Sequence, residues 1–287
     1  MNGIVIIDKP AGWTSQDVVS KLRGVLHTKR IGHGGTLDPM ATGVLPVFVG
    51  RATRGVEFFE HAEKTYETVL RLGLTTDTED ITGTVLTEQD AFVTGEQLEA
   101  VLENFRGEIM QVPPMYSALK VGGQKLVDLA RKGKVVERRP RPVTIHELTL
   151  LSVEADGIHL RVRCSKGTYI RTLCKDIGQA LGCGGCMASL RRVTAGEYTI
   201  DEAVPLQELV EAAEPERYLR SVDTMFMNYP TTTLTEKQEK RCRCGNAFSV
   251  NKAPGTYRVY SQAGEFLALA KAEDGVMSTI KSFFEVE

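Results

Sequence analysis

Apolar residues in the first part of the chain fall into short runs whose spacing predicts a strand, a helix and a second strand. Residues 3–8 (GIVIID) are almost wholly apolar and end at a turn, as in a buried strand. Residues 14–27 follow with apolar side chains at helical spacing, and Thr14 is a suitable N-cap. Residues 64–74 alternate in polarity, which predicts a strand with Tyr66 on its more apolar face.

The middle of the chain predicts three more helices and a hairpin. A capping-box pattern begins a helix over residues 94–107. Residues 143–165 have the pattern of two strands joined by an Asp-Gly turn. Residues 167–182 predict a helix that Thr168 caps, and residues 205–213 predict a shorter one. Helices and strands thus mix, which indicates an α+β fold.

Proline and glycine divide the chain further. Residues 107–142 contain four prolines and four glycines among many basic residues, which is typical of a projecting insertion. Composition changes at a linker over residues 228–234, and short strand-like runs follow it. We therefore expect a first domain over residues 1–228 and a small β-rich domain over residues 229–287.

Composition narrows the class of protein. The chain has 287 residues, of which 42% are hydrophobic and 25% charged, as in an ordinary globular protein. No run approaches the about 20 apolar residues that span a bilayer, and the first residues lack a basic, signal-like start. These features predict a cytoplasmic protein without a membrane segment.

Charge is unevenly spread although the formal net charge is only -2. Residues 57–103 hold twelve acids and two bases, whereas residues 106–142 hold nine bases and three acids. Residues 161–192 add seven bases against one acid. Basic segments of this kind attract polyanions whatever the total charge, so we expect a nucleic-acid partner rather than an ordinary solvated surface.

The six cysteines do not form a convincing metal site. Cys183 and Cys186 make one close pair, and Cys242 and Cys244 another. The second spacing is too short for a zinc knuckle, and more than fifty residues separate the pairs. We expect ordinary reduced thiols and no metal.

The segment HGGTLDPMATGVLPVFVG, from His33 to Gly50, contains one carboxylate, Asp38, among glycines and apolar residues. An acid in such a setting has a desolvation cost, which suggests a chemical role, while a turn-capping aspartate before proline is the alternative that these residues taken alone favour. Glycosidases use two carboxylates, and Asp38 has no second acid before Glu57. HExxH, Walker-A and GxSxG patterns are absent, so we expect chemistry by one carboxylate without a cofactor.

Six ordered segments resemble the motifs of the TruB family of tRNA pseudouridine-55 synthases, and they span the chain from Gly3 to about Asp223. They are GIVIIDKPAGWTS, GHGGTLDPMATGVLPV, KTYE with LRLGLTTDTEDITG, VPPMYSALKVGGQKLVDLARKG, SKGTYIRTLCKDIGQALG and ASLRRVTAGEY. The tail resembles, more loosely, the PUA-type RNA-binding domain of that family. One departure is Gly34, where the family usually has threonine.

The resemblance implies a pseudouridine synthase domain with a central mixed or antiparallel sheet, followed by a PUA-like domain. It implies that Asp38 is the catalytic aspartate, that Arg171 pairs with it, and that Tyr66 stacks on the target base. Asp38 would either attack C1′ of the uridine or remove a 2′ proton, and the sequence leaves both routes open. Both need the ionised carboxylate, and neither needs a cofactor.

The resemblance also implies how RNA is held. The target uridine flips out of its loop, His33 fills the vacated space, and Lys9 and Pro10 pack beneath the site. Tyr169 and Leu190 would line the pocket for the uracil base. The insertion would grip the T stem-loop of tRNA through basic side chains such as Lys120 and Lys132. We expect the protein to act as a monomer.

Two other interpretations remain open at this stage. The first is an RNA-binding or RNA-folding protein that does not need turnover. The second is a guide-RNA-dependent synthase of the same superfamily, against which the chain length and the insertion argue. The set of Asp38, Tyr66 and Arg171 favours an enzyme, because a pure binding protein would not need it.

Overall fold

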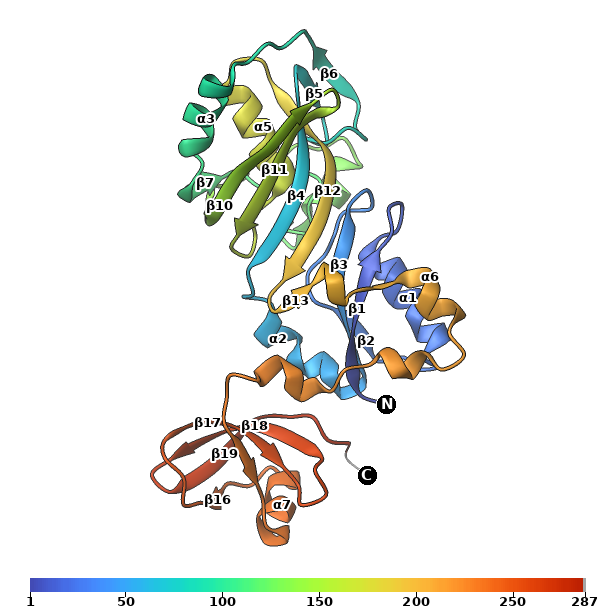
Figure 1. Cartoon of the computed structure of the whole chain (residues 1–287), viewed down its shortest axis with the longest axis vertical. Coiled ribbons are helices and arrows are strands. Elements are labelled where there is room, and N and C mark those ends of the chain that lie inside the picture. The colour runs from blue at the N-terminus through green and yellow to red at the C-terminus, as the bar shows by residue number, and fades with distance from the viewer. Residues whose placement is uncertain (286–287) are drawn as a thin grey trace.

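A computed structural model describes residues 1–285 and shows a large sheet and a small one (Figure 1). The large sheet has ten strands, with these bounds: β1 (Gly3–Lys9), β2 (Ile31–His33), β3 (Thr42–Val49), β4 (Lys64–Leu72), β7 (Gly107–Gln111), β10 (Arg141–Glu154), β11 (Gly157–Cys164), β12 (Gly185–Ala195), β13 (Tyr198–Thr199) and β14 (Val204–Pro205). The small sheet has five: β15 (Thr231–Thr233), β16 (Phe248–Ser249), β17 (Gly255–Tyr260), β18 (Phe266–Glu273) and β19 (Val276–Ser282).

Helices and two short hairpins complete the fold. The helices are α1 (Ser15–Val25), α2 (Val56–Phe59), α3 (Gly95–Glu103), α4 (Leu126–Ala130), α5 (Ile170–Ala180), α6 (Leu206–Glu211) and α7 (Glu236–Arg243). The hairpins pair β5 (Leu74–Thr76) with β6 (Val85–Glu88), and β8 (Lys120–Val121) with β9 (Gln124–Lys125). No helix among residues 1–285 is long and apolar enough to cross a membrane.

The large sheet is mixed. Its strand order is β14-β1-β3-β12-β4-β11-β10-β7, with β2 beside β3 and β13 beside β12. The pairs β1–β14 and β3–β12 are parallel, and the remaining pairs are antiparallel. The predicted α+β class with a mixed central sheet and a β-rich C-terminal part is confirmed.

Local signals explain the helices that support the sheet. In α1, Thr14 Oγ1 accepts a hydrogen bond from the Asp17 amide at 3.0 Å, and the Asp17 carboxylate accepts one from the Thr14 amide at 2.9 Å. This capping box begins α1 as the sequence predicts. The buried faces of α1, α3, α5 and α6 share one apolar core with the large sheet.

A second apolar cluster joins the two sheets. Phe226, from a 3-10 turn that precedes the small sheet, has its ring centroid 6.1 Å from that of Phe266 and 5.7 Å from that of Phe283. Residues of β1, β3 and β13 belong to the same cluster. Arg54 Nη1 also donates to Ser282 Oγ at 2.7 Å. Apolar packing and polar bonds therefore dock the small sheet on the large one.

Three of the predicted boundaries are wrong. Helix α5 begins at Ile170 with Tyr169 as its N-cap, and Thr168 Oγ1 instead donates to the Ser165 carbonyl. Helix α3 ends at Glu103, four residues before the predicted end. The linker predicted over 228–234 contains β15, because Thr231–Thr233 pair with β17.

The segment 107–142 is not wholly a projecting insertion. Its ends form β7 and the start of β10, which pair with each other at the edge of the large sheet. The part between them carries α4 and the β8–β9 hairpin. The charged residues of this segment hid the strands, because a sheet edge tolerates alternating polar side chains. The division at residue 228 lies between the two sheets and, as a folding boundary, stays a prediction.

Candidate active site

The loop that carries Asp38 connects β2 to β3 and is held from several sides. The Leu37 amide donates to Ser15 Oγ at 2.9 Å, and Ser15 lies in the first turn of α1. The Pro39 carbonyl accepts from the Gly12 amide at 2.8 Å and from Lys9 Nζ at 3.3 Å. The loop is thereby fixed between the end of β1 and the start of α1.

Asp38 and Arg171 form a two-pronged ion pair. Arg171 Nε lies 2.9 Å from Asp38 Oδ2, and Arg171 Nη2 donates to Asp38 Oδ1 at 3.2 Å. The Arg171 side chain is 6% exposed and that of Asp38 is 33% exposed. A planar fork that holds both oxygens fixes the carboxylate in position as well as neutralising it. Side chains 133 residues apart in the chain thus meet as the resemblance implied.

Arg171 is itself fixed by a loop that follows β5. Its Nη1 donates to the Thr78 carbonyl at 3.1 Å and lies 3.8 Å from Asp80 Oδ2. Its Nη2 donates also to the Tyr116 carbonyl at 2.9 Å. The buried Asp80 accepts hydrogen bonds from Thr78 and from Thr82. Sequence reasoning treated residues 76–83 as a polar loop and missed Asp80, although the loop lies inside a quoted family motif.

The surroundings of Asp38 act on its acidity in opposite directions. Burial is the largest influence and raises the pKa of the Asp38 carboxyl above its ordinary value of 3.8. The Arg171 guanidinium opposes this shift, and the Asp80 carboxylate adds to it. A carboxylate whose pKa is raised is a stronger base and nucleophile once ionised, so the pocket suits either of the two chemical routes.

Asp38 and Arg171 line a pocket of about 430 Å³, which is large enough for a nucleoside. Tyr66 from β4 and Leu190 from β12 lie in its wall, as does Tyr169. These three residues and the ion pair are therefore brought together around one cavity.

A glutamine at the end of β7 positions Tyr169. The Tyr169 amide donates to Gln111 Oε1 at 3.0 Å, and Gln111 Nε2 donates to the Tyr169 carbonyl at 3.2 Å. Gln111 is 1% exposed, so this clamp is shielded from water. It fixes the residue that precedes α5, and hence the helix that carries Arg171. The sequence offered no signal for Gln111, because a glutamine in a Pro-rich segment is typical of a surface.

Lys9 and Pro10 lie behind the Asp38 loop and do not line the pocket. Lys9 is 0% exposed, and its Nζ donates to the carbonyls of Pro10, Trp13 and Pro39. Burial lowers the pKa of Lys9 to about 8, although the nearby Asp38 charge opposes the shift. Lys9 therefore supports the loop from beneath, at a cost in desolvation.

His33, Lys120 and Lys132 also lie outside the residues that line the pocket. His33 ends β2, and burial lowers the pKa of its imidazole, which favours the neutral ring. Lys120 and Lys132 are exposed on the segment between β7 and β10. The same segment contributes Tyr116 and Ser117 to the pocket wall, so it reaches the cavity and the solvent together.

Two buried basic residues stand beside Tyr66. Arg192 is the bulkiest fully buried side chain of the described chain, and its guanidinium donates to the Val44 and Gly35 carbonyls at 2.7 and 3.2 Å. Those two residues flank the Asp38 loop on either side, so Arg192 ties its ends together. Lys64 is 8% exposed and donates to the Ala62 carbonyl. Sequence reasoning singled out neither residue, because basic residues in strands are usually at the surface.

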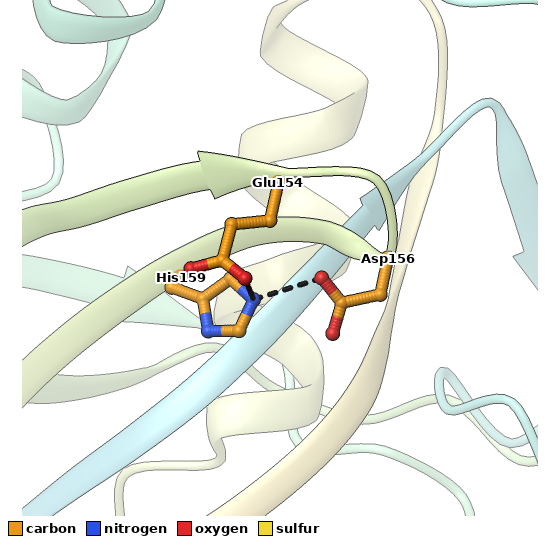
Figure 2. A group of neighbouring side chains, drawn as sticks. All are labelled: Glu154, Asp156 and His159. Carbon is orange, nitrogen blue, oxygen red and sulfur yellow. Dashed lines mark hydrogen bonds and ion pairs between the residues drawn. The ribbon is translucent and has the colours of Figure 1, made fainter.

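Glu154, Asp156 and His159 bring possible metal-ligand atoms within 4.8 Å of one another at the turn between β10 and β11 (Figure 2). The two acids are exposed, and His159 Nε2 already lies 2.9 Å from Asp156 Oδ1. This pair raises the pKa of His159 and lowers that of Asp156. An ordinary ion pair in a hairpin accounts for the group. It lies at the opposite end of β11 from Cys164, which faces Lys64 and the pocket end of β4.

Comparison with known proteins extends these observations. Residues 23–170 match the family described as TruB family pseudouridylate synthase (N terminal domain), and residues 171–224 match the tRNA pseudouridylate synthase B C-terminal domain. The chain belongs to the TruB family. The tRNA pseudouridine synthase B of Stutzerimonas stutzeri is 45% identical over 284 residues, which cover 96% of this chain and 93% of that protein. That of Pseudomonas aeruginosa is 44% identical over 282 residues, with the same coverage.

Solved structures show the same fold. The chain superposes with a TM-score of 0.73 on a structure described as a Cbf5-Nop10-Gar1 complex, at 26% identity, over 98% of this chain and 85% of the other. An H/ACA RNP bound to a substrate RNA containing 2′-deoxyuridine gives a TM-score of 0.72 at 24% identity, over 99% and 85%. The small C-terminal sheet lies within the matched length, which is consistent with a PUA-like domain.

Proposed function

We propose that this protein isomerises uridine to pseudouridine at position 55, in the T-loop of tRNA. The observation that carries the proposal is the forked Asp38–Arg171 ion pair in the wall of a nucleoside-sized pocket. Bacterial relatives named tRNA pseudouridine synthase B, about 45% identical over nearly the whole chain, support the substrate. We favour a stand-alone enzyme over a guide-RNA-dependent one, because the chain length and the basic segment over residues 107–142 suit a direct grip on tRNA.

On this proposal, five residues of the pocket each have a part in the reaction. Asp38, ionised and held by Arg171, attacks C1′ or removes a 2′ proton, and the bond between C1′ and N1 breaks. Tyr66 stacks on the freed base, and Leu190 and Tyr169 confine it while it turns. The bond between C1′ and C5 then forms as the Asp38–C1′ ester breaks or, on the other route, as the proton returns to C2′, and finally C5 loses its proton to solvent and N1 gains one. The reaction is an isomerisation, so no group has to be supplied.

A pocket of this kind excludes a base that stays stacked. The target uridine must therefore leave its loop, at a cost of a few kcal/mol that contacts in the pocket offset. His33, at the end of β2 beside the Asp38 loop, would fill the vacated position, as the family resemblance implies. Lys9 and Pro10 would not contact the uridine and would act by supporting the loop that carries Asp38.

The rest of the RNA is held by charge and shape. Lys120 and Lys132 are exposed on the segment that also forms one pocket wall, so a T stem-loop bound there would bring its loop to Asp38. The small C-terminal sheet supplies a second RNA contact. Action as a monomer and a cytoplasmic location stay predictions.

The deciding experiment uses Asp38→Asn, which keeps the shape of the side chain and removes its charge. Purified wild-type and variant proteins are incubated with an unmodified tRNA transcript that carries tritium at C5 of its uridines, and tritium release is followed. We expect release by the wild-type protein, mapped to position 55, and no detectable release by the variant. Asp90→Asn, at an exposed position, is the matched control and should behave as wild type.

Binding is measured on the same preparations by gel shift. Asp38→Asn should bind tRNA at least as tightly as wild type, because it loses a charge that repels phosphate, and binding should weaken as salt rises. Turnover by Asp38→Asn would exclude Asp38 as the catalyst. A wild-type protein that binds tRNA and speeds its refolding without forming pseudouridine would instead support the RNA-folding interpretation.

A further inference from the structure

Lys64, Tyr66 and Arg192 form one row of side chains on the floor of the pocket. Tyr66 and Arg192 are directly opposite each other in the antiparallel pair of β4 and β12. Lys64 is two residues before Tyr66 on β4, so its side chain lies on the same face. All three line the cavity that contains Asp38. Two basic groups therefore flank the aromatic ring that is proposed to stack on the target base.

Neither basic group has an acidic partner. Within residues 1–285, no carboxylate oxygen lies within the 4.0 Å of an ion pair from Arg192 or Lys64. Arg192 uses Nε and Nη2 on two carbonyls, and Lys64 uses one ammonium proton on the Ala62 carbonyl. Arg192 also forms a side-chain hydrogen bond with Tyr66, which is uncharged and so leaves the charge of the guanidinium unpaired. Two protons of Lys64 remain for a ligand.

Such an arrangement is costly in an empty pocket. Arg192 is 1% exposed and Lys64 is 8% exposed. Buried charges are normally paired, because desolvation of an unpaired charge costs several kcal/mol. In keeping with this, burial lowers the pKa of both groups. The chain retains two uncompensated charges beside its reaction centre, which indicates that the substrate supplies the acceptor.

We propose that Lys64 and Arg192 bind the keto oxygens of the target uracil and stabilise the negative charge that the base gains during the reaction. The proposal rests on the function proposed above and adds the groups that act on the leaving base. When the C1′–N1 bond breaks by either route, its electron pair stays on N1. The uracil ring then spreads this charge over its keto oxygens. Preorganised donors aimed at such oxygens lower the barrier.

The base is a better ligand for this floor than a phosphate. Both basic groups are almost wholly buried beside Tyr66, whereas the phosphates of a polynucleotide have to enter and leave by the pocket mouth. An exposed basic side chain, Lys166, lies at the mouth of the pocket and could contact such a phosphate there. Cytosine would also be a poor ligand, because its C4 amino group presents donors where uracil presents an acceptor.

Other groups near the floor do not neutralise it. The Cys164 thiol faces Lys64 from β11, and burial raises its pKa to about 11, so it stays uncharged at neutral pH. Asp38 is held by Arg171, and Glu60 is exposed at the edge of the cavity. The positive potential on the floor is therefore available to the base.

The test compares Lys64→Gln with Lys64→Arg. Glutamine keeps a hydrogen-bond donor for the Ala62 carbonyl and loses the charge, whereas arginine keeps both. Single-turnover tritium release at saturating enzyme is measured beside the tRNA dissociation constant and the unfolding midpoint. We expect Lys64→Gln to react 10- to 1000-fold more slowly, with a dissociation constant within about twofold of wild type. Lys64→Arg should recover most of the rate.

Arg191→Met is the matched control, because Arg191 neighbours Arg192 on β12 but pairs with Asp8 outside this pocket. It should react at the wild-type rate. A wild-type rate in Lys64→Gln would overturn the proposal. If Lys64→Gln loses only tRNA affinity, and the slope of log affinity against log salt concentration falls by about one phosphate contact, the proposal would be overturned in favour of a phosphate site. Equal losses in both Lys64 variants that follow their unfolding midpoints would overturn it in favour of a structural role. An inactive wild-type protein would refute the proposed function instead.

Discussion

The Phe59 ring fills the space that a side chain at Gly34, in the Asp38 loop, would need. A Cβ atom built on Gly34 would lie 2.6 Å from Cδ1 of the Phe59 ring and 3.0 Å from Cε2 of Phe48. Phe59 lines the reaction pocket, and its ring stacks on that of Tyr198 with 5.7 Å between centroids. The glycine that stands where the family usually has threonine is therefore the residue that this phenylalanine requires.

Replacing Gly34 by threonine should destabilise the protein, because the Phe59 ring would have to give up part of its packing against Phe48 and Tyr198. We expect a loss of about 1–3 kcal/mol in the free energy of unfolding, as for overpacked cores. Denaturant unfolding of Gly34→Thr measures it.

A double-mutant cycle tests whether Phe59 is the cause. Phe59→Leu shortens the side chain, so the threonine should cost less in the double variant than in the wild-type background. An equal cost in both backgrounds would show that the backbone of the loop, rather than the ring, excludes a side chain at position 34.

Arg171→Lys should reduce turnover strongly while tRNA affinity changes little. Lysine keeps the charge but cannot hold both oxygens of Asp38 and the Thr78 and Tyr116 carbonyls together. Single-turnover tritium release and gel shift separate the two effects. Near-normal turnover would mean that the charge alone suffices and that the fork has no role.

The acid limb of the pH–rate profile should report Asp38. Burial raises the pKa of Asp38 above 3.8, so kcat/KM should begin to fall at a pH above the range of an exposed aspartate as the pH is lowered. The charge of Arg171 opposes this shift, so Arg171→Gln, which removes the charge, should move the limb to higher pH. A limb that stays in place in the variant would assign it to another group.

Lys9 should make the free energy of unfolding depend on pH in the alkaline range. Its pKa is about 8 in the folded protein against 10.5 in the free chain, so the unfolded state binds more protons between these values. Stability from this group is therefore lost as pH falls through 8 and rises as pH increases toward 10.5. The unfolding free energy of wild type, relative to Lys9→Met, should rise by about 1–2 kcal/mol from pH 8 to pH 9.5. A constant difference would show that Lys9 titrates normally.

Removing residues 230–287 should weaken tRNA binding and leave some turnover at high protein concentration, because every residue that lines the pocket lies between residues 34 and 192. The cut also exposes Phe226, whose ring packs on Phe266 and Phe283. Phe226→Ser within the truncated chain should limit aggregation. Gel shift and tritium release on this protein provide the test, and complete inactivity of a folded preparation would contradict the prediction.

The residues expected to act together could be named from the sequence because each lies in a local motif, and their chemical roles stay predictions. Asp38, Arg171 and Tyr66 each lie in a quoted segment, and the structure brings them to one cavity. What the motifs could not predict are contacts made across the sheet. Arg192 and Gln111 act through carbonyls that are distant in the chain, so no spacing pattern reveals them.

The prediction of secondary structure from the sequence failed where tertiary contacts outweighed local conformational preference. Thr168 is a good N-cap by composition, but its hydroxyl is used by the Ser165 carbonyl, and Gln111 holds the Tyr169 backbone instead. Strand β12 was not predicted at all, because its central Arg191 and Arg192 break the apolar pattern. Their charges are met by Asp8 and by the carbonyls of Val44 and Gly35, which only the folded chain brings close.

The aromatic packing of Phe226 on the small sheet holds that sheet at a fixed distance from the reaction pocket. Two linked binding surfaces raise affinity through effective concentration only if one ligand reaches both, and a stiff connection sharpens this condition. An RNA that presents its target loop and a second contact at the matching separation gains from both surfaces. A loop of the same sequence on a body of another length gains from one. Discrimination among RNAs would then arise from distance as well as from the bases at the reaction centre.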